Sequence, residues 1–191
     1  MQIRVFVWLI FSGVFLAFEA DSQDPTKYAL FQLEGEELFW RNTYEYSDAP
    51  DELRYRVVQM LKSKFFTFNV TRNETGYTGE IRYYQVDCKR YGRSSLTTPR
   101  MYWEGEWTGK FMVVLLPNQY RVTIYALHYE KLEQSSGYYR TQQPVKGMYI
   151  NAVTTKKKKG LKKSEFSNLV LMSVSLKDNF DINNTVLPQQ R

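Results

Sequence analysis

The side chains that could take part in acid–base or nucleophilic chemistry are few in this chain and widely separated. His128 is the only histidine and Cys88 the only cysteine among 191 residues. A Ser–His–Asp or Cys–His relay needs a histidine beside both a nucleophile and an orienting carboxylate. The residues next to His128 supply no such set. We therefore expect His128 to be a structural or surface side chain and Cys88 to be a buried, unreactive thiol.

Carboxylates occur close together at Glu34, Glu36 and Glu37, and again at Glu104 and Glu106. Glycoside hydrolysis needs two carboxyl groups about 5 to 9 Å apart across a cleft, whereas glutamates beside a glycine in a turn are usually solvated. The chain has no ligand spacing typical of zinc, no P-loop, no dinucleotide fingerprint and no Gly-x-Ser-x-Gly elbow. The sequence predicts a protein that is not an enzyme and has no cofactor. A glycan hydrolase using the Glu104/Glu106 region is the third alternative.

The first 22 residues have the pattern of a secretion signal. Arg4 precedes an apolar run, residues 5–18, that is shorter than the roughly 20 residues of a membrane span. The small side chains of Ala20 and Ser22 suit cleavage before Gln23. We interpret residues 1–22 as a cleaved signal peptide, with an uncleaved anchor as the alternative. An exported chain with one cysteine has no internal disulfide, which fits a bacterial periplasm or cell surface.

A run of lysines near the C-terminus is a candidate anion-binding loop. It comprises Lys156, Lys157, Lys158, Lys159, Lys162 and Lys163. Such a run could bind phosphate or an acidic glycan, and its plainer interpretation is a solvated loop. The formal charge of the whole chain is +6, which favours anionic partners. For an exported protein these are acidic protein surfaces, acidic glycans and, in weak contact, an anionic membrane surface. We do not expect nucleic acid as a partner.

Hydrophobic periodicity predicts one α+β domain over residues 23–180, followed by a polar tail over 181–191. Alternation indicates strands over 38–46, 65–71, 77–88, 110–116 and 120–132. Apolar residues at steps of three and four indicate two helices. The first begins at Pro50 with a cap at Ser47 or Asp48, and the second is capped by Ser164 and ends near Asn179. Segments 89–109 and 133–155 are interpreted as irregular.

This order of elements predicts a mostly antiparallel sheet of about five strands with both helices on one face. The other face of the sheet would then stay open unless a partner covers it.

Several short motifs occur in the order seen in a family of exported Bacteroidetes domains of unknown function. They are Gly35-Glu36-Glu37-Leu38-Phe39-Trp40, Asp51-Glu52-Leu53, Leu61-Lys62-Ser63, Gly79-Glu80-Ile81 and Gln119-Tyr120-Arg121-Val122-Thr123-Ile124. The chain resembles this family over roughly residues 30–130. The resemblance implies a fold like half of a TATA-binding protein, with the order β-α-β-β-β-β-α. It implies no activity, and it does not imply DNA binding, because one fold hosts unrelated functions.

Aromatic residues make up 16% of the chain, with 15 tyrosines. Tyrosine and tryptophan suit sugar stacking and protein interfaces as well as hydrophobic cores. In the strand over 120–132, four side chains alternate with apolar ones and would lie on the open face, and segment 89–109 adds an aromatic cluster. The predicted binding surface consists of Arg121, Thr123, Tyr125, Tyr129, Tyr102, Trp103 and Trp107.

The sequence therefore predicts an exported, non-enzymatic domain that binds an envelope protein or glycan through its open sheet face and aromatic loop. The alternative is a carrier of a small apolar ligand, either a lipocalin-like barrel or a domain with a cavity of about 300 Å³ or more between sheet and helices. Gly105-Glu106-Trp107 matches the Gly-x-Trp of lipocalins, but it lies in mid-chain, so we treat the match as coincidental.

Overall fold

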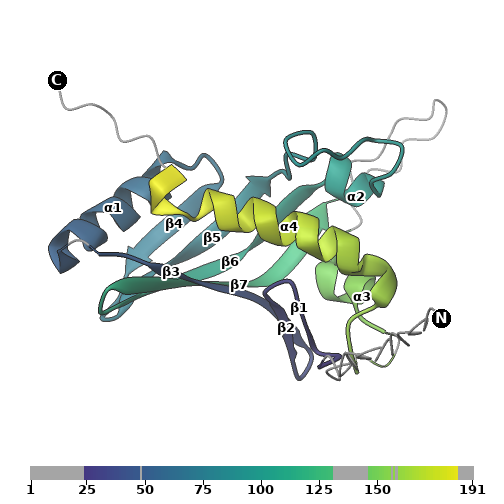
Figure 1. Cartoon of the computed structure of the whole chain (residues 1–191), viewed down its shortest axis with the longest axis horizontal. Coiled ribbons are helices and arrows are strands. Elements are labelled where there is room, and N and C mark those ends of the chain that lie inside the picture. Colours follow the sequence, from purple (N-terminus) through teal and green to yellow (C-terminus); the bar gives the residue numbers. More distant parts are fainter. Residues whose placement is uncertain (1–23, 48, 131–145, 156, 158, 185–191) are drawn as a thin grey trace, which may run out of the picture.

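The computed structural model describes residues 24–184 except positions 48, 131–145, 156 and 158 (Figure 1). The predicted signal peptide, Lys156 and Lys158 therefore lie outside the described residues, as does the end of the predicted polar tail.

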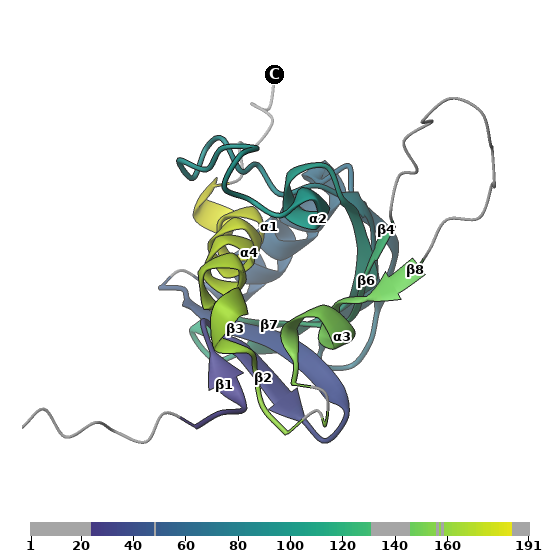
Figure 2. The same cartoon turned by 90° about the vertical axis from the view of Figure 1, so that its right-hand side faces the viewer.

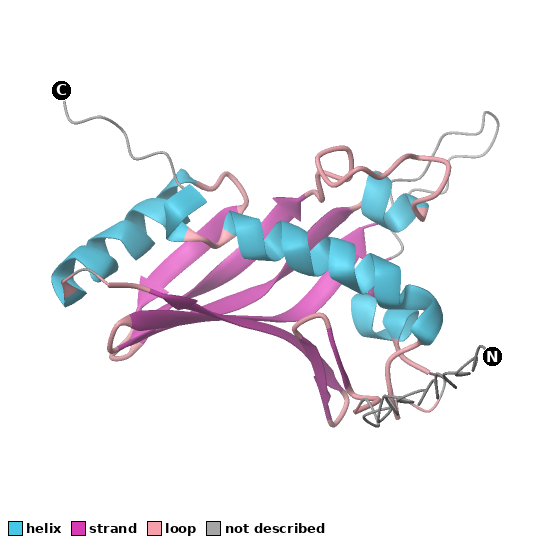
Figure 3. Cartoon of the chain, viewed as in Figure 1, coloured by secondary structure: helices cyan, strands magenta, loops and turns pink. Residues whose placement is uncertain are grey.

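Eight strands in the described part of the chain form one antiparallel sheet (Figure 3). Seven lie in the order β1-β2-β3-β7-β6-β5-β4, and β8 pairs with β7 at residues that β3 does not reach. The sheet is open, with β1 and β4 as its ends, and does not close into a lipocalin-like barrel. The strands are β1 (Lys27–Tyr28), β2 (Phe31–Glu34), β3 (Glu37–Glu45), β4 (Thr67–Arg72), β5 (Gly76–Tyr84), β6 (Glu106–Leu116), β7 (Gln119–Glu130) and β8 (Lys146–Met148).

The prediction of about five strands was too low. The additional strands β1, β2 and β8 contain two, four and three residues, and such short segments give too little alternation to be recognised. The five longer strands lie where the sequence predicted them, with ends shifted by up to four residues.

Two long helices, α1 (Pro50–Ser63) and α4 (Phe166–Asn179), lie where the sequence predicted them. The residue before α1 is Ala49 and the residue before α4 is Glu165, and neither makes a side-chain capping hydrogen bond. The predicted caps at Ser47 and Ser164 are therefore wrong, and Asp48, the alternative cap of α1, lies outside the described residues. At α1, Pro50 in the first turn favours the helical backbone without a cap. None of the described helices is both long and apolar enough to cross a membrane.

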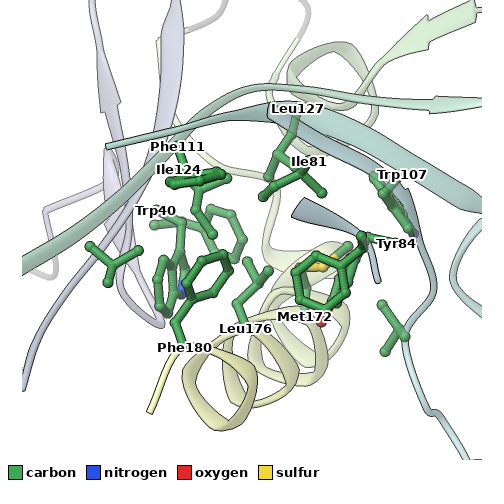
Figure 4. Close-up of a cluster of buried hydrophobic side chains, with 14 of the residues drawn as sticks. Trp40, Ile81, Tyr84, Trp107, Phe111, Ile124, Leu127, Met172, Leu176 and Phe180 are labelled. Carbon is green, nitrogen blue, oxygen red and sulfur yellow. The ribbon is translucent and has the colours of Figure 1, made fainter. Parts of the chain in front are cut away.

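Both long helices pack on the same face of the sheet, here called the inner face (Figures 1 and 2). The short helices α2 (Arg100–Trp103) and α3 (Tyr149–Val153) pack there as well. Strand residues such as Trp40, Phe111 and Ile124 are fully buried against Met172 and Leu176 of α4 (Figure 4). One continuous core therefore lies between the sheet and its helices.

Four aromatic side chains of the sheet form hydrogen bonds to α4 and the residue after it. Trp40 Nε1 donates to Ser173 Oγ at 3.0 Å, and the hydroxyls of Tyr84 and Ser175 lie 2.5 Å apart. The hydroxyls of Tyr44 and Tyr120 donate to the carbonyl oxygens of Lys177 and Phe180, both at 2.9 Å. These bonds satisfy polar groups that would otherwise be costly to bury.

The two segments interpreted as irregular contain ordered elements. Segment 89–109 includes α2 and the start of β6, and segment 133–155 includes β8 and α3. Tyr102, Trp107 and Tyr149 from these elements are fully buried together, with the rings of Trp107 and Tyr149 at 4.9 Å in an edge-to-face contact. Helices of four or five residues are too short to show a helical period, which is why the sequence did not reveal them.

The packed domain continues past residue 180, so the predicted boundary of the tail was too early. Ile182, in the 3₁₀ turn Ile182–Asn184, is 1% exposed, and its N–H donates to the Tyr120 hydroxyl at 3.0 Å. A single apolar residue in a polar segment gives no periodic pattern, so the burial of Ile182 could not be predicted from the sequence.

The buried tyrosines should make the fold sensitive to alkali. Burial raises the pKa of Tyr84, Tyr102, Tyr120 and Tyr149 well above the ordinary value of 10.0. Above about pH 10 the unfolded chain releases these protons while the folded chain retains them, so the free energy of unfolding must fall as the pH rises. We expect urea denaturation to give a free energy of unfolding that decreases with rising pH, most steeply from about pH 10 to 12.

Tyrosinate absorbance provides the matching measurement, because the buried tyrosines should ionise only together with unfolding. A free energy of unfolding that stays constant up to about pH 12 would contradict the burial of these hydroxyls.

Candidate binding surface

The sheet face opposite α1 and α4, here called the outer face, is covered by no described helix (Figures 1 and 2). On β7, Val122 and Ile124 are buried against the core, so Arg121 and Tyr125 point outward by alternation. The same rule places Phe39, on β3, on the outer face beside the buried Trp40. The uncovered face predicted from the order of elements is therefore present in the described part of the chain.

Seven side chains from the three central strands form what we call the outer-face patch. The rings of Phe39 and Tyr125 face each other with centroids 6.2 Å apart. The Arg41 guanidinium lies 5.8 Å from the Phe39 ring centroid, and its Nη1 is 3.4 Å from a carboxylate oxygen of Glu34. Arg41, Thr123 and Met112 are direct neighbours across the strands. The patch comprises Phe39, Arg41, Lys110, Met112, Arg121, Thr123 and Tyr125.

Arg121 and Tyr125 lie on the outer face as predicted. Thr123 shares that face but is only 4% exposed, so it forms the base of the patch and offers little contact surface of its own. Its nearest cross-strand neighbours are the longer side chains of Arg41 and Met112, which can cover a threonine.

Tyr129 lies on the inner face, so the prediction that it shares a face with Tyr125 is wrong. A β-bulge interrupts β7, where Ala126 and Leu127 together oppose Gly109 of β6, and Ala126 has a φ of 52°. After the bulge Leu127 points into the core, and the Tyr129 ring contacts that of Trp107 at 5.7 Å. A glycine inside a strand is the usual signal of a bulge, so Gly109 was the available clue.

The predicted aromatic loop does not form an exposed cluster. Tyr102 and Trp107 are fully buried, because they pack against each other and Tyr149 on the inner face. Trp103 alone of the three is partly exposed, and it lines a pocket on the inner side of the sheet.

One lysine of the described part of the run is engaged in the fold, and the others are exposed. The side chain of Lys162 donates to the carbonyl oxygens of Asn151 and Ala152, at 3.4 and 2.6 Å, and so stabilises the end of α3. Lys163 lies in the 3₁₀ turn before α4, and Lys157 and Lys159 are exposed.

The remaining chemically active side chains have structural contacts. Glu104 forms an ion pair with Arg100 at 2.5 Å, and Glu106 accepts a 3.4 Å hydrogen bond from Gln85. Cys88 is 4% exposed, and burial raises the pKa of its thiol, so the reactive thiolate is disfavoured. No group of three or more metal-ligating side chains occurs among the residues that the structure describes.

A hollow of about 360 Å³ adjoins the patch on the outer face. Its lining includes Lys110, His128 and Arg82, and it lies between two bulges. The bulge residues Tyr83 and Ala126 both have left-handed backbones, with φ of 57° and 52°. Because bulges change the direction of side chains, they place cationic and titratable groups at the edge of the aromatic patch. Sequence reasoning did not identify this hollow.

Among known proteins, this chain is similar to solved structures only. No protein-family model matches the chain, and no curated protein is significantly similar to it. The fold is similar to a TBP-like protein from Parabacteroides distasonis, with a TM-score of 0.45, 11% identity, and 78% of this chain and 94% of that chain covered. It is also similar to a DUF4468 family protein from Bacteroides ovatus, with a TM-score of 0.44, 11% identity, and 90% and 99% covered. These similarities bear out the resemblance to Bacteroidetes domains and carry no information about function.

The bulge beside the patch can be tested by substitution. A left-handed backbone is unfavourable for alanine and readily adopted by glycine. We therefore expect Ala126→Gly to raise the free energy of unfolding by about 0.5–1 kcal/mol, measured by urea denaturation. The same change at Ala152, inside α3, should lower it by a similar amount, about 0.5–1 kcal/mol, because glycine disfavours helix. Destabilisation by Ala126→Gly would show that the strand is not bulged there.

Proposed function

We propose that this chain is an exported, non-enzymatic domain that binds an envelope protein through the outer-face patch. The observation that supports the proposal is the Phe39–Tyr125 ring pair on an uncovered sheet face. The Arg41 guanidinium lies over the Phe39 ring and Lys110 is the cross-strand neighbour of Tyr125, while Met112 and Arg121 lie further along the same face. Aromatic residues, methionine and arginine are the types enriched in protein interfaces, and energetically important interface residues are most often Trp, Tyr and Arg.

The chemistry of the patch defines the partner that would fit it. The centre offers apolar and aromatic surface, and Arg41, Lys110 and Arg121 lie around it. A complementary surface would have an apolar centre with carboxylates at its edge, and the +6 charge of the chain would favour its approach.

A protein partner suits the patch better than a glycan. Sugar stacking needs a whole ring face that is open to the ligand. Here both rings are partly buried and tilted at 34° to each other, and together they present a broad mixed surface. An envelope glycan remains the second partner class, which the experiment below distinguishes.

We expect charge reversal in the patch to abolish binding. The double variant Tyr125→Glu/Arg121→Glu removes one ring and reverses one charge, and the matched control Lys62→Glu changes an exposed residue of α1. A partner captured from the envelope by the wild type should be purified and titrated calorimetrically against all three proteins. Affinity should fall at least about tenfold for the double variant and stay unchanged for Lys62→Glu.

Equal affinity of the captured protein for wild type and double variant would remove the patch as the binding site. Capture that survives protease treatment and is lost with glycosidase would replace the protein by a glycan.

Export can be tested separately. We expect the protein recovered from the cell envelope to begin at Gln23, as determined by N-terminal sequencing and intact mass. Ser22→Tyr should block this cleavage, because signal peptidase needs a small residue at that position. Recovery of the wild-type chain with Met1 in the membrane fraction would support the uncleaved anchor instead.

A further inference from the structure

A larger hollow, of about 560 Å³, lies on the opposite side of the sheet from the outer-face patch. Tyr84 at the end of β5 and Ser175 of α4 form part of its wall, and residues 85–91 border it. No residue of the patch lines it. The volume falls within the range of small-molecule sites, about 300–1,000 Å³.

The wall of this hollow is aromatic, and part of it is exposed. Phe66 and Tyr84 are buried and form a ring pair at 4.9 Å. Phe65 is 76% exposed and contacts the Phe66 ring edge-to-face at 5.6 Å. Trp103 adds a partly exposed indole. An aromatic ring left this open beside a pocket provides apolar contact area that the fold itself does not use.

Cationic groups lie at the mouth. Lys89 and Arg90 both line the hollow. The Arg90 guanidinium lies 3.3 Å from a carboxylate oxygen of Asp178, and the Tyr91 hydroxyl donates to the same oxygen at 3.0 Å, so Arg90 is held in place. The Asp87 carboxylate accepts the backbone N–H of Arg90 at 3.1 Å.

A neighbouring lysine adds to the positive charge. Lys64 is half-buried, and its pKa is lowered first by burial and then by the charge of Arg90. Lys64, Lys89 and Arg90 therefore bring three cations to this edge of the hollow, and the carboxylates of Asp87, which also lines it, and Asp178 offset part of their charge.

We propose that this hollow binds a small amphipathic anion. The apolar or aromatic body of the ligand would lie against Phe65, Phe66, Tyr84 and Trp103. Its carboxylate, sulfonate or phosphate group would lie at Lys89 and Arg90. This site is independent of the outer-face patch, and it revives the ligand-carrier alternative at a pocket between the sheet and α4.

The test uses 8-anilinonaphthalene-1-sulfonate, an aromatic anion whose fluorescence rises in apolar surroundings, titrated into the folded full chain. We expect binding at one site, with energy transfer from Trp103. Phe65→Ala should weaken binding about three- to tenfold and Arg90→Ala about two- to fivefold. Arg90→Lys, which keeps the charge, should recover most of the affinity. The matched controls Tyr125→Ala and Arg121→Ala, in the patch, should leave it unchanged.

The uncharged analogue N-phenyl-1-naphthylamine isolates the contribution of the anion. It should bind more weakly than the sulfonate to the wild type and equally to wild type and Arg90→Ala. Cooperative thermal unfolding of each variant shows that the dye reports a folded site. The proposal is overturned if the dye does not bind, if Phe65→Ala and Arg90→Ala bind it like the wild type, or if the uncharged analogue binds as tightly.

Discussion

The hydrogen bonds between the sheet and α4 are the constraint on which the rest of the molecule depends. Polar groups on Trp40, Tyr44, Tyr84 and Tyr120 meet partners spread along the chain from Ser173 to Phe180. These four large aromatic side chains can be buried because each of their polar groups has a partner. A shift of α4 by one residue would break several of these bonds together, so its position on the inner face is fixed. The inner face is therefore occupied by the hydrophobic core. Surface that could bind a ligand or a partner remains at the edge of the inner face and on the outer face.

The bulges explain how one sheet supports both a deep core and an uncovered face with charged side chains. Without the bulge at Ala126, Leu127 and Tyr129 would point outward, and Trp107 would lose a neighbour in the core. With it, the far half of β7 turns Leu127 and Tyr129 toward the core, where the Tyr129 ring contacts Trp107, while His128 takes the outward position. Gly109 allows this geometry, since a Cβ there would lie 3.2 Å from the Tyr125 carbonyl oxygen and from a Leu127 methyl group. The backbone irregularity thus contributes to the core and shapes the outer hollow at the same time.

The elements that could be predicted are those whose own residues repeat with a clear period. Both long helices could be predicted because each has a stripe of apolar residues at helical spacing. The stripe of α1 consists of Leu53, Val57 and Met60, and that of α4 of Leu169, Met172 and Leu176. The burial of Tyr102 could not be predicted, because its partner Tyr149 is 47 residues away in sequence and lies on a helix too short to recognise. The face of Tyr129 depended on the bulge, and the hollow beside Arg90 on the approach of α4 to residues 85–91. Hydrophobic periodicity therefore predicted the longer elements of this fold but not the contacts between segments that are far apart in the sequence.

One segment of β5 borders both the outer and the inner hollow, although the two hollows share no lining residue. Tyr83 lines the outer hollow and Tyr84 lines the inner one, so the two residues place their side chains on opposite sides of the sheet. They lie at a bulge, and Tyr83 has a left-handed backbone, which is unfavourable for a residue with a large side chain. Tyr84 is held by Ser175 and by the packing of Phe66. The outer and inner hollows therefore differ in their lining residues and adjoin each other at the bulge of β5.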